Sequence, residues 1–577
     1  MGEAAVFMPP VWRSAPCRGS ADRHPSRMTS VRGGRSWFTP LRESPVVNRV
    51  EVVVPHQRCW PGLSKENRLV AAQTASHPTT RTRSDCTSTH VDVLIIGAGV
   101  SGIGAAHHLR ENFPERSFTI LESQESFGGT WLTHRYPGTR SDSDLFTYGY
   151  RHKPWSGPSI ARAEPIREYL QEVIDDDDLA DHIQYGNRVI GLAWDSPEGR
   201  WTATVRRTTD ATADEATTTQ VTASFLWMCN GYYDHETPYR PEWTGEEDFQ
   251  GIVVHPQHWP TDLDCAGKRI VIVGSGSTAT TLAPVLAQDS AHTTMLQRSP
   301  SYYFIAPTVH ELAATLEPLD LPDEWVHEIL RRQYIKQTDE IVTLSREQPE
   351  AAREFLLDGI RDAVPADVDF DKHFLPDYRP WQERLVSIPD GDFFTEMQAG
   401  RLTVETDTID RFTERGVLLE SGEELEADII VTATGMTMTS FANVPFTVDG
   451  EQVDFTERIT WRGMMITGIP NMAFALGYFR YSWTLRVDIV NDLLARIFRH
   501  MESTGSTVVI PTLRPQDEGM ERRPWVDPDN VSAGYMVRAL DRLYRQGDRA
   551  PWQQMLEYDH EREAFPAADI TDGLSYR

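Results

Sequence analysis

One local pattern occurs twice in this chain and constrains its fold more than any other feature. The first copy, VDVLIIGAGVSGIGAAHHL from Val91, is typical of a strand, a glycine turn and a helix, and the next strand ends at Glu122. Gly97 allows the tight turn, Gly99 lets a pyrophosphate approach the backbone, and Gly102 lets the helix pack closely. Glu122 follows Gly102 by 20 residues, where a ribose-binding acid belongs. The pattern predicts a Rossmann-like domain for an adenine dinucleotide with an unphosphorylated ribose.

The second copy, RIVIVGSGSTATTLAPVLAQDSAHTTMLQRS, repeats the strand, glycine turn, helix and strand. Gly274 and Gly276 take the first two glycine positions, and Ala279 takes the third. The second strand ends in Gln297 and Arg298 instead of an acid. A guanidinium there suits a ribose 2′-phosphate, which a carboxylate would repel, so we expect NADPH at this site. The alternative for Arg298 is an ordinary solvent-exposed arginine at a strand end.

Two such folds, the first for a nucleotide without a 2′-phosphate, indicate FAD and NADPH as cofactors, and a flavin supplies redox chemistry that side chains lack. A third segment, ELEADIIVTATG at residues 424–435, is typical of a buried strand, and we expect it to return the chain to the FAD domain. The predicted fold class is α/β, with two Rossmann-like dinucleotide-binding domains, a discontinuous FAD domain and a helical insert in the NADPH domain. The predicted division is an Arg-, Ser- and Pro-rich disordered tail at 1–88, FAD-binding parts at 89–240 and 395–577, and an NADPH-binding part at 241–394 with the insert at about 308–375.

Composition limits the partners of the chain. A length of 577 residues exceeds what one core usually serves, and a formal charge of -29 argues against a nucleic-acid ligand. The sequence contains no apolar run of about 18 residues, so no transmembrane segment is predicted. Peripheral membrane association is compatible with this composition. The five cysteines are scattered without a C-x-x-C pair, which fits a reducing cytoplasm.

The first 90 residues differ from the rest, because they carry 13 Lys or Arg against 6 Asp or Glu. They show no sustained hydrophobic period and lack the apolar segment of a secretory signal. We interpret them as disordered. The alternatives are a transit peptide or an upstream start codon that was wrongly assigned.

Three further motifs lie outside the glycine patterns. FQGIVVHPQHWP at 249–260 has the spacing F-x-G-x-x-x-H-x-x-x-W-P, and GGTWLTHRYPGTRSD at 128–142 has the spacing G-G-x-W-x-x-x-x-Y-P-G-x-x-x-D. The third motif is PWQERLVSIPDGDFF at 380–394. Together they resemble the flavin-containing and Baeyer-Villiger monooxygenases, most closely the ethionamide-activating branch. The resemblance extends from about residue 91 to about residue 560.

This resemblance implies an FAD- and NADPH-dependent monooxygenase that inserts one atom of O2 into ketones to give esters through a C4a-peroxyflavin. It also implies oxidation of sulfur compounds, so the substrate would be a small hydrophobic carbonyl or sulfur compound. Arg384 is implied as the active-site arginine, which favours a nucleophilic peroxide and stabilises charge on the tetrahedral adduct. Asp142 would orient Arg384 through a charge-assisted hydrogen bond. The alternative for the pair is an ordinary salt bridge between domains.

Other functions compete with this interpretation. One is a sulfide- or amine-oxygenating flavin monooxygenase, although such relatives usually carry Tyr or Phe at the position of Trp259. A non-oxygenating flavin reductase of the disulfide type would need a C-x-x-C pair, which is absent. A non-catalytic nucleotide-binding protein would lack flavin. The sequence leaves the physiological substrate and the oligomeric state open.

His255 and Trp259 of the first motif lie between the two glycine patterns, and the resemblance implies that they couple the two domains. A satisfied structural histidine is the alternative for His255. No metal is expected, because the segment offers no third and fourth ligand beside His255 and His258. Glu383 departs from the family, because many members carry a lysine there that helps to hold the NADPH 2′-phosphate.

The glycine patterns and the family motifs together assign a set of residues to cofactor binding. The set consists of Gly97, Gly99, Ser101, Gly102, Glu122, Gly129, Thr130, Trp131, Arg140, Ser141, Asp142, Val189, Gly274, Ser275, Gly276, Thr278, Ala279, Thr281, Gln297 and Arg298.

Overall fold

The structure is a computed structural model that describes residues 89–208 and 218–577. The predicted disordered tail at residues 1–88 therefore lies outside the described residues. No helix among the described residues has the length and apolar character needed to cross a bilayer. A cytoplasmic location stays a prediction.

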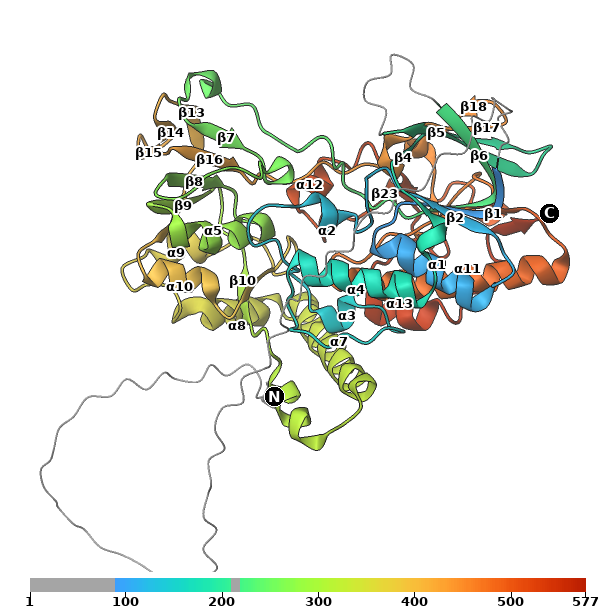
Figure 1. The fold of residues 1–577 in the computed structure, drawn as a ribbon, viewed down its shortest axis with the longest axis horizontal. Coiled ribbons are helices and arrows are strands. Elements are labelled where there is room, and N and C mark those ends of the chain that lie inside the picture. Colours follow the sequence, from blue (N-terminus) through green and yellow to red (C-terminus); the bar gives the residue numbers. More distant parts are fainter. Residues whose placement is uncertain (1–88, 209–217) are drawn as a thin grey trace, which may run out of the picture. The chain divides into compact units, whose positions relative to one another are not determined.

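The first glycine pattern lies in a nine-stranded sheet with the order β18-β17-β4-β5-β6-β1-β2-β3, and β21 pairs beside β6 (Figure 1). β1 runs parallel to β2 and β6, so the turn after β1 lies at the carboxyl edge of parallel strands, where dinucleotides bind. β4, β5 and β6 pair antiparallel. The strands are β1 Thr89–Ile96, β2 Phe118–Leu121, β3 Ile183–Gln184, β4 Asn187–Asp195, β5 Arg200–Arg207, β6 Thr218–Met228, β17 Phe446–Val448, β18 Glu451–Gln452 and β21 Met472–Phe474.

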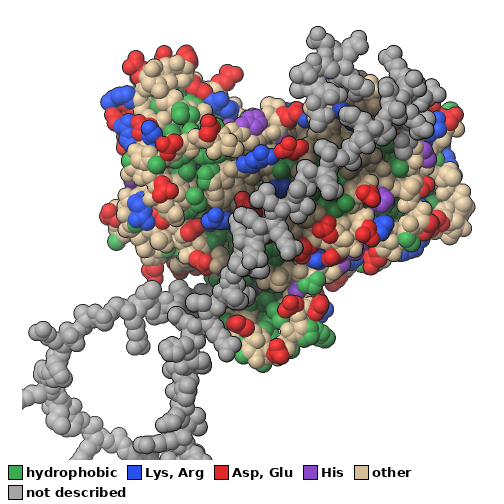
Figure 2. Space-filling view, in the orientation of Figure 1, with side chains coloured by type: hydrophobic (Ala, Val, Ile, Leu, Met, Phe, Trp, Pro, Cys, Tyr) green, Lys and Arg blue, Asp and Glu red, His purple; other side chains and the backbone are tan. Residues whose placement is uncertain are grey.

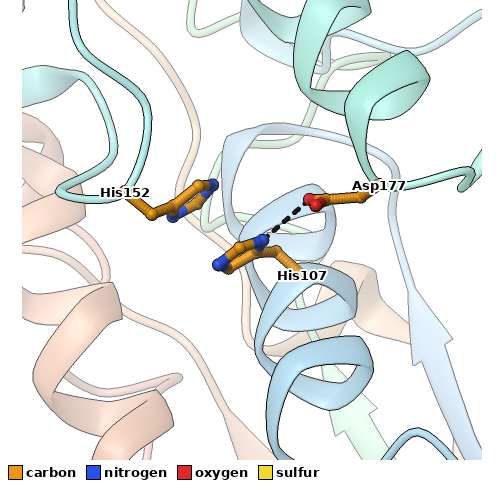
Figure 3. Close-up of side chains that lie close together, drawn as sticks. All are labelled: His107, His152 and Asp177. Carbon is orange, nitrogen blue, oxygen red and sulfur yellow. Dashed lines mark hydrogen bonds and ion pairs between the residues drawn. The ribbon is translucent and has the colours of Figure 1, made fainter.

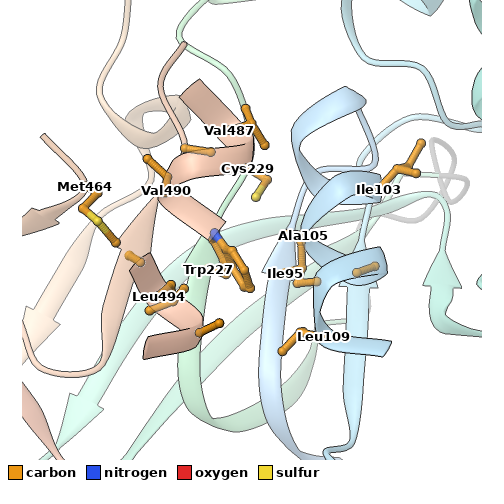
Figure 4. Close-up of a cluster of buried hydrophobic side chains, with 14 of the residues drawn as sticks. Ile95, Ile103, Ala105, Leu109, Trp227, Cys229, Met464, Val487, Val490 and Leu494 are labelled. Carbon is orange, nitrogen blue, oxygen red and sulfur yellow. The ribbon is translucent and has the colours of Figure 1, made fainter. Parts of the chain in front are cut away.

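Two helices from distant parts of the sequence pack against this sheet, α1 (Val100–Asn112) and α11 (Trp483–Thr504). Figure 4 shows α1 and α11 on either side of Trp227, a residue of β6. Trp227, Leu109 of α1 and Leu494 of α11 are each at most 2% exposed. Burying a side chain of this size contributes about 1.5 to 3 kcal/mol, so the core holds the C-terminal helix in the first domain.

The second glycine pattern lies in a five-stranded parallel sheet with the order β12-β9-β8-β16-β7. Its central strands β8 and β16 are rich in β-branched residues and buried on both faces, as a parallel sheet covered by helices requires. Ile272, Leu282 and Phe393 are fully buried in its core. The elements are β7 Ile252–Val254, β8 Arg269–Val273, α5 Ser277–Asp289, β9 His292–Gln297, α10 Asp392–Gln398, β12 Leu402–Thr406 and β16 Ile429–Thr432. The predicted fold class is confirmed.

The predicted boundary between the NADPH-binding part and the second FAD-binding part was wrong. β16 was expected to return the chain to the FAD domain, yet it lies between β8 and β7 of the second sheet. β12 also belongs to that sheet, so the second domain continues past residue 394 to Thr432. A buried β-branched run fits the centre of either parallel sheet, and its sequence does not specify which strands it joins.

The insert predicted at about 308–375 is helical, as expected. It comprises α6 Glu311–Leu316, α7 Asp323–Glu347, α8 Pro349–Arg361 and α9 Phe370–Phe374, between the paired strands β10 Tyr303–Ala306 and β11 Val386–Pro389. α7 packs on α3 (Leu145–Tyr148) of the first domain. Buried Arg331 of α7 donates hydrogen bonds to the carbonyl oxygens of Phe146 and Gly149, at 2.8 and 3.1 Å. The insert therefore belongs to the second domain in sequence and contacts the first in space.

The remaining elements cover the sheets or connect them. On the face that Figure 2 shows, the described residues present acidic and basic side chains interspersed, without a broad basic surface of the kind that binds nucleic acid. These elements are α2 Thr130–Thr133, α4 Ala163–Asp176, β13 Ile409–Phe412, β14 Gly416–Leu419, β15 Glu424–Glu426, β19 Thr460–Trp461, β20 Met465–Ile466, β22 Val509–Pro511, β23 Arg523–Pro524, α12 Gly534–Val537, β24 Arg545–Gln546, α13 Tyr558–Ala564 and β25 Leu574–Tyr576.

Candidate active site

A cavity of about 1110 Å³ is lined by both glycine turns. The structure thus brings together most of the residues that the sequence assigned to cofactors and catalysis. The predicted residues in its wall are Gly97, Gly99, Ser101, Glu122, Gly129, Thr130, Trp131, Arg140, Asp142, Val189, Gly274, Ser275, Gly276, Thr278, Thr281, Arg298 and Arg384.

Other predicted residues lie outside this lining, namely Gly102, Ser141, His255, Trp259, Ala279 and Gln297. Gln297 is buried, and its amide donates hydrogen bonds to the carbonyl oxygen of His373 at 2.7 Å and to Thr406 Oγ1 at 2.9 Å. Ser141 is also buried and accepts a hydrogen bond from the amide of Ala161. Neither side chain is in the cavity wall, so the structure gives both a role in packing. Successive side chains of a strand point to opposite faces, which separates Gln297 from Arg298.

The first turn is shaped by close backbone contacts. Gly97 has a φ of +102°, and a Cβ there would lie 2.8 Å from the carbonyl oxygen of Cys229. A Cβ at Gly102 would overlap the carbonyl oxygen of Gly97. The buried carboxylate of Glu122 accepts hydrogen bonds from the amides of Ala98 and Gln124, both at 2.8 Å. Glu122 therefore braces the turn from within the protein and also lines the cavity.

The second turn has the same conformation but a more open environment. Gly274 has a φ of +129°, and a Cβ there would overlap the carbonyl oxygen of Ala433, just after β16. No atom lies within 4 Å of the Cβ position of Gly276. Arg298 is exposed at the cavity wall, where Glu122 of the first turn is buried. The second turn thus has open space in front of it and a cation at the end of its second strand.

Arg384 and Asp142 meet at the contact between the domains. Arg384 Nε donates to Asp142 Oδ2 at 2.8 Å, and Arg384 Nη2 lies 2.7 Å from the same oxygen. Ser277, the first residue of α5, donates from Oγ to Asp142 Oδ2 at 3.1 Å. Burial disfavours the charged form of Asp142, but Arg384 and Ser277 outweigh it and hold its pKa below the ordinary value. Burial also disfavours the guanidinium, yet Asp142 keeps the pKa of Arg384 above its ordinary value. The pair is therefore ionised at neutral pH.

Three tyrosines beside Arg384 were missed by the sequence analysis. The Tyr232 hydroxyl donates to the Tyr233 hydroxyl at 3.0 Å, and the rings of Tyr233 and Tyr535 have centroids 6.0 Å apart. All three line the cavity. Burial raises the pKa of each of them, so they present neutral hydroxyl groups near the guanidinium of Arg384. Tyr535 lies about 300 residues after the adjacent pair Tyr232 and Tyr233, so the three form no motif, and only the fold brings them together.

His255 lies near two other histidines at the junction between the domains. Its Nδ1 accepts a hydrogen bond from the amide of Gln257, and burial lowers its pKa to about 4. Burial, with His235 and His255 nearby, lowers the pKa of His134 to about 3. Trp259 packs against the core of the second sheet. A coupling role for His255 and Trp259 stays a prediction, and this placement between the domains is compatible with it.

Three potential metal ligands gather elsewhere, His107 of α1, His152 and Asp177 (Figure 3). His107 Nδ1 and Asp177 Oδ2 are 2.7 Å apart, and the rings of His107 and His152 stack with centroids 3.3 Å apart and planes 7° apart. Imidazole lone pairs lie in the ring plane, so stacked rings do not direct them at one tetrahedral ion. The arrangement supports packing of α1 against the end of α4, and the expectation of no metal stays a prediction.

Fold and site define a class of protein: a two-domain α/β protein in which two dinucleotide-binding turns share one cavity with an arginine and aspartate pair. Residues 95–170 match the family model described as NAD(P)-binding Rossmann-like domain. The chain is 42% identical to the FAD-containing monooxygenase EthA of Mycobacterium tuberculosis, over 84% of this chain and 98% of that protein. It is 39% identical to the probable FAD-binding monooxygenase AlmA of Acinetobacter baylyi, over 84% and 95%. The chain belongs to the FAD-containing monooxygenases.

Solved structures share the fold. An oxidized steroid monooxygenase bound to NADP matches with a TM-score of 0.66 and 21% identity, over 85% of this chain and 99% of that chain. An open crystal structure of cyclohexanone monooxygenase matches with a TM-score of 0.62 and 19% identity, over 85% and 100%. Both matches extend over both domains of this chain, so the two-domain fold is common to these enzymes.

Proposed function

We propose that this flavin monooxygenase uses NADPH and O2 to insert one oxygen atom into ketones, giving esters, and that it also oxidises sulfur compounds. The observation that carries the proposal is the ionised pair of Arg384 and Asp142 in a cavity lined by both glycine turns. The cyclohexanone and steroid monooxygenases that share the fold support a carbonyl substrate.

The two turns fit the two cofactors. Gly99 and Gly129 pack closely at the first turn, where a Cβ on Gly129 would lie 3.2 Å from the Cα of Gly99, and both line the cavity, so their lack of side chains suits the approach of a pyrophosphate. Glu122 in the same wall suits the ribose hydroxyls of FAD. Gly276 and Arg298 at the second turn suit the pyrophosphate and the 2′-phosphate of NADPH. When bound and reduced by NADPH, FAD activates O2 for the transfer of one oxygen atom.

Arg384 acts on the charge that the reaction creates. When oxygen adds to a carbonyl carbon, the carbonyl oxygen of the substrate becomes negative, and a fixed guanidinium beside it lowers the energy of that state. A guanidinium keeps its charge at every pH at which the enzyme works. The neutral hydroxyls of Tyr232, Tyr233 and Tyr535 surround Arg384 without cancelling its charge.

Asp142 positions Arg384. Its Oδ2 accepts hydrogen bonds from both the guanidinium of Arg384 and the hydroxyl of Ser277, so Arg384 is oriented relative to the first turn of α5. Because Asp142 comes from the first domain and Ser277 from the second, the domains must be in contact for Arg384 to have this orientation. The contact therefore couples the placement of NADPH to the placement of the catalytic charge.

Product analysis with labelled oxygen tests this function. The purified protein should be yellow, and with NADPH, a cyclic ketone and ¹⁸O2 it should form a lactone that contains one labelled oxygen. An aryl methyl sulfide in a parallel reaction should give a labelled sulfoxide. Sulfoxide without lactone would assign the enzyme to sulfur oxygenation alone, and NADPH oxidation that yields only hydrogen peroxide with a broad set of ketones and sulfides would contradict the proposal.

A further inference from the structure

Two arginines line the same cavity, and neither guanidinium forms an ion pair with a described residue. Arg298 follows β9, and Arg538 follows α12 (Gly534–Val537) near the C-terminal end of the chain. The backbone amide of Arg538 donates to the carbonyl oxygen of Gly534, but neither guanidinium makes a hydrogen bond or an ion pair with any residue that the structure describes. The guanidinium carbon of Arg538 lies 3.4 Å from the ring centroid of Tyr239, which also lines the cavity. A ring face of this kind holds a guanidinium in place and leaves its N–H donors free.

The structure makes room for the guanidinium of Arg538 at the edge of the second domain. A Cβ at Gly435, where φ is +103°, would lie 3.6 Å from Arg538 Nη2, and a Cβ at Gly534 would lie 3.1 Å from Arg538 Nη1. Gly435 lies shortly after β16. This contact therefore places the guanidinium of Arg538, which belongs to the C-terminal segment, next to the second sheet. Burial lowers the pKa of Arg538, and repulsion from Arg298 and Arg542 adds to this effect. An anion bound between Arg298 and Arg538 would relieve this repulsion.

Glu383 shows why a second cation is required at this site. It also lines the cavity, and burial raises its pKa against the attraction of Arg298. Its carboxylate offsets part of the charge of Arg298 at a position where the resembled family carries a lysine. A ribose 2′-phosphate holds about 1.5 to 2 negative charges at neutral pH, so Arg298 beside Glu383 is a weak partner for it.

We propose that Arg538 and Arg298 together bind the 2′-phosphate of NADPH, and that Arg538 supplies the cation that Glu383 does not. This inference rests on the proposed use of NADPH. The 2′-phosphate would then connect the second domain, through Arg298, with the C-terminal segment, through Arg538. That segment also carries Tyr535, which lies beside Arg384. One short stretch of chain thus carries both the proposed phosphate ligand Arg538 and Tyr535, a neighbour of the catalytic arginine.

Binding of nucleotide fragments to the FAD-loaded protein tests this proposal without turnover. The probes are adenosine 2′,5′-bisphosphate and 5′-AMP, with dissociation constants measured by calorimetry. Wild type should bind the bisphosphate more tightly than 5′-AMP. Arg538→Gln should weaken bisphosphate binding about tenfold and leave 5′-AMP binding unchanged, because each charge-assisted contact contributes on this scale. Arg542→Gln is the matched control, because Arg542 is close to Arg538 but outside the cavity wall, and it should bind like wild type.

A second variant separates a direct contact from a structural effect. Glu383→Lys in the Arg538→Gln background should restore bisphosphate binding, because it supplies a cation on the other side of Arg298. In turnover, Arg538→Gln should raise KM for NADPH about tenfold with little change in kcat or in the use of NADH. Equal loss of both probes in Arg538→Gln, or no loss of either, would overturn the role of Arg538. Wild type without preference for the bisphosphate would instead overturn the use of NADPH itself.

Discussion

The two glycine turns have the same local sequence pattern and conformation but opposite surroundings. In the first turn, Glu122 is buried and accepts hydrogen bonds from two backbone amides, so the residue that we propose for nucleotide selection is part of the core. In the second turn, Arg298 is exposed and forms no ion pair with a described residue, although the carboxylate of Glu383 is near it. The first turn is therefore complete within its own domain. The second turn shares its cavity with residues from elsewhere in the chain, including Arg384 and Arg538, which we propose complete its site.

This difference suits a tightly held cofactor and an exchanging one. A selector that is also part of the core gives a preorganised site that retains its ligand, whereas an exposed cation in open space allows binding and release. Substitutions in the first turn should therefore destabilise the fold more. Substitutions in the second turn should change the kinetics with NADPH more.

Alanine substitutions at the turns should give the largest difference. Gly102→Ala places a methyl group on the carbonyl oxygen of Gly97, so we expect loss of bound flavin and of soluble protein. Gly276→Ala meets no protein atom within 4 Å, so folding and flavin content should be retained. The added methyl would occupy space needed by the NADPH pyrophosphate, and KM for NADPH should rise about tenfold. Flavin-to-protein ratio and steady-state kinetics measure these effects. Equal tolerance of both changes would show that the turns do not differ.

Arg384→Ala should affect chemistry without affecting either turn. Loss of the guanidinium should reduce ester formation from ketones by about a hundredfold or more, because it removes several kcal/mol of stabilisation of the developing charge. Flavin content and flavin reduction by NADPH should change little, and hydrogen peroxide should replace the product. Exposed Arg379→Ala is the matched control and should retain activity. If Arg384→Ala oxidised ketones at close to the wild-type rate, Arg384 and Asp142 would form only a structural salt bridge between the domains.

Exchanging the selectors separates the two cofactors. Glu122→Gln keeps one acceptor but loses the charge and points an amide group at the backbone donors, so FAD binding should weaken about tenfold. Arg298→Gln should leave FAD binding unchanged and reduce the preference for NADPH over NADH. Flavin release on dilution and the ratio of kcat/KM values measure the two effects. A change in flavin retention by Arg298→Gln would contradict the separation of the sites.

A pH effect should act on the stability of the fold and leave both cofactor sites unchanged. His134 has a pKa of about 3 in the fold against 6.5 ordinarily, so below pH 6.5 the unfolded chain takes up a proton that the folded protein does not. Stability should therefore fall as pH decreases, by about 2 kcal/mol from this group between pH 6.5 and 5. Thermal unfolding of His134→Asn should show a shallower fall, and exposed His560→Asn should behave like wild type. An identical slope in His134→Asn would show that the residue is protonated in the fold.

Sequence patterns were most successful where the structure is local. The turns at Gly97 and Gly274, the helices of the insert and the acid at Glu122 depend on short-range geometry, and the structure has each of them where the pattern predicts. The pairing of Arg384 with Asp142 was implied by family motifs and not by spacing, and the side chains do meet. Gln297 was predicted to bind a cofactor, but its buried side chain lies outside the cavity wall and donates a hydrogen bond to the carbonyl oxygen of His373.

The sequence by itself determined that the chain contains two dinucleotide-binding units, because a β-branched strand, a glycine turn and a helix leave the backbone few alternatives. Only the tertiary structure decided that β16 joins the second sheet, since a buried strand can satisfy its hydrogen bonds beside any parallel neighbour. The same holds for the tyrosines around Arg384 and for the position of Arg538 over Tyr239. These contacts join residues hundreds of positions apart, and such contacts form only because the whole core places their segments together.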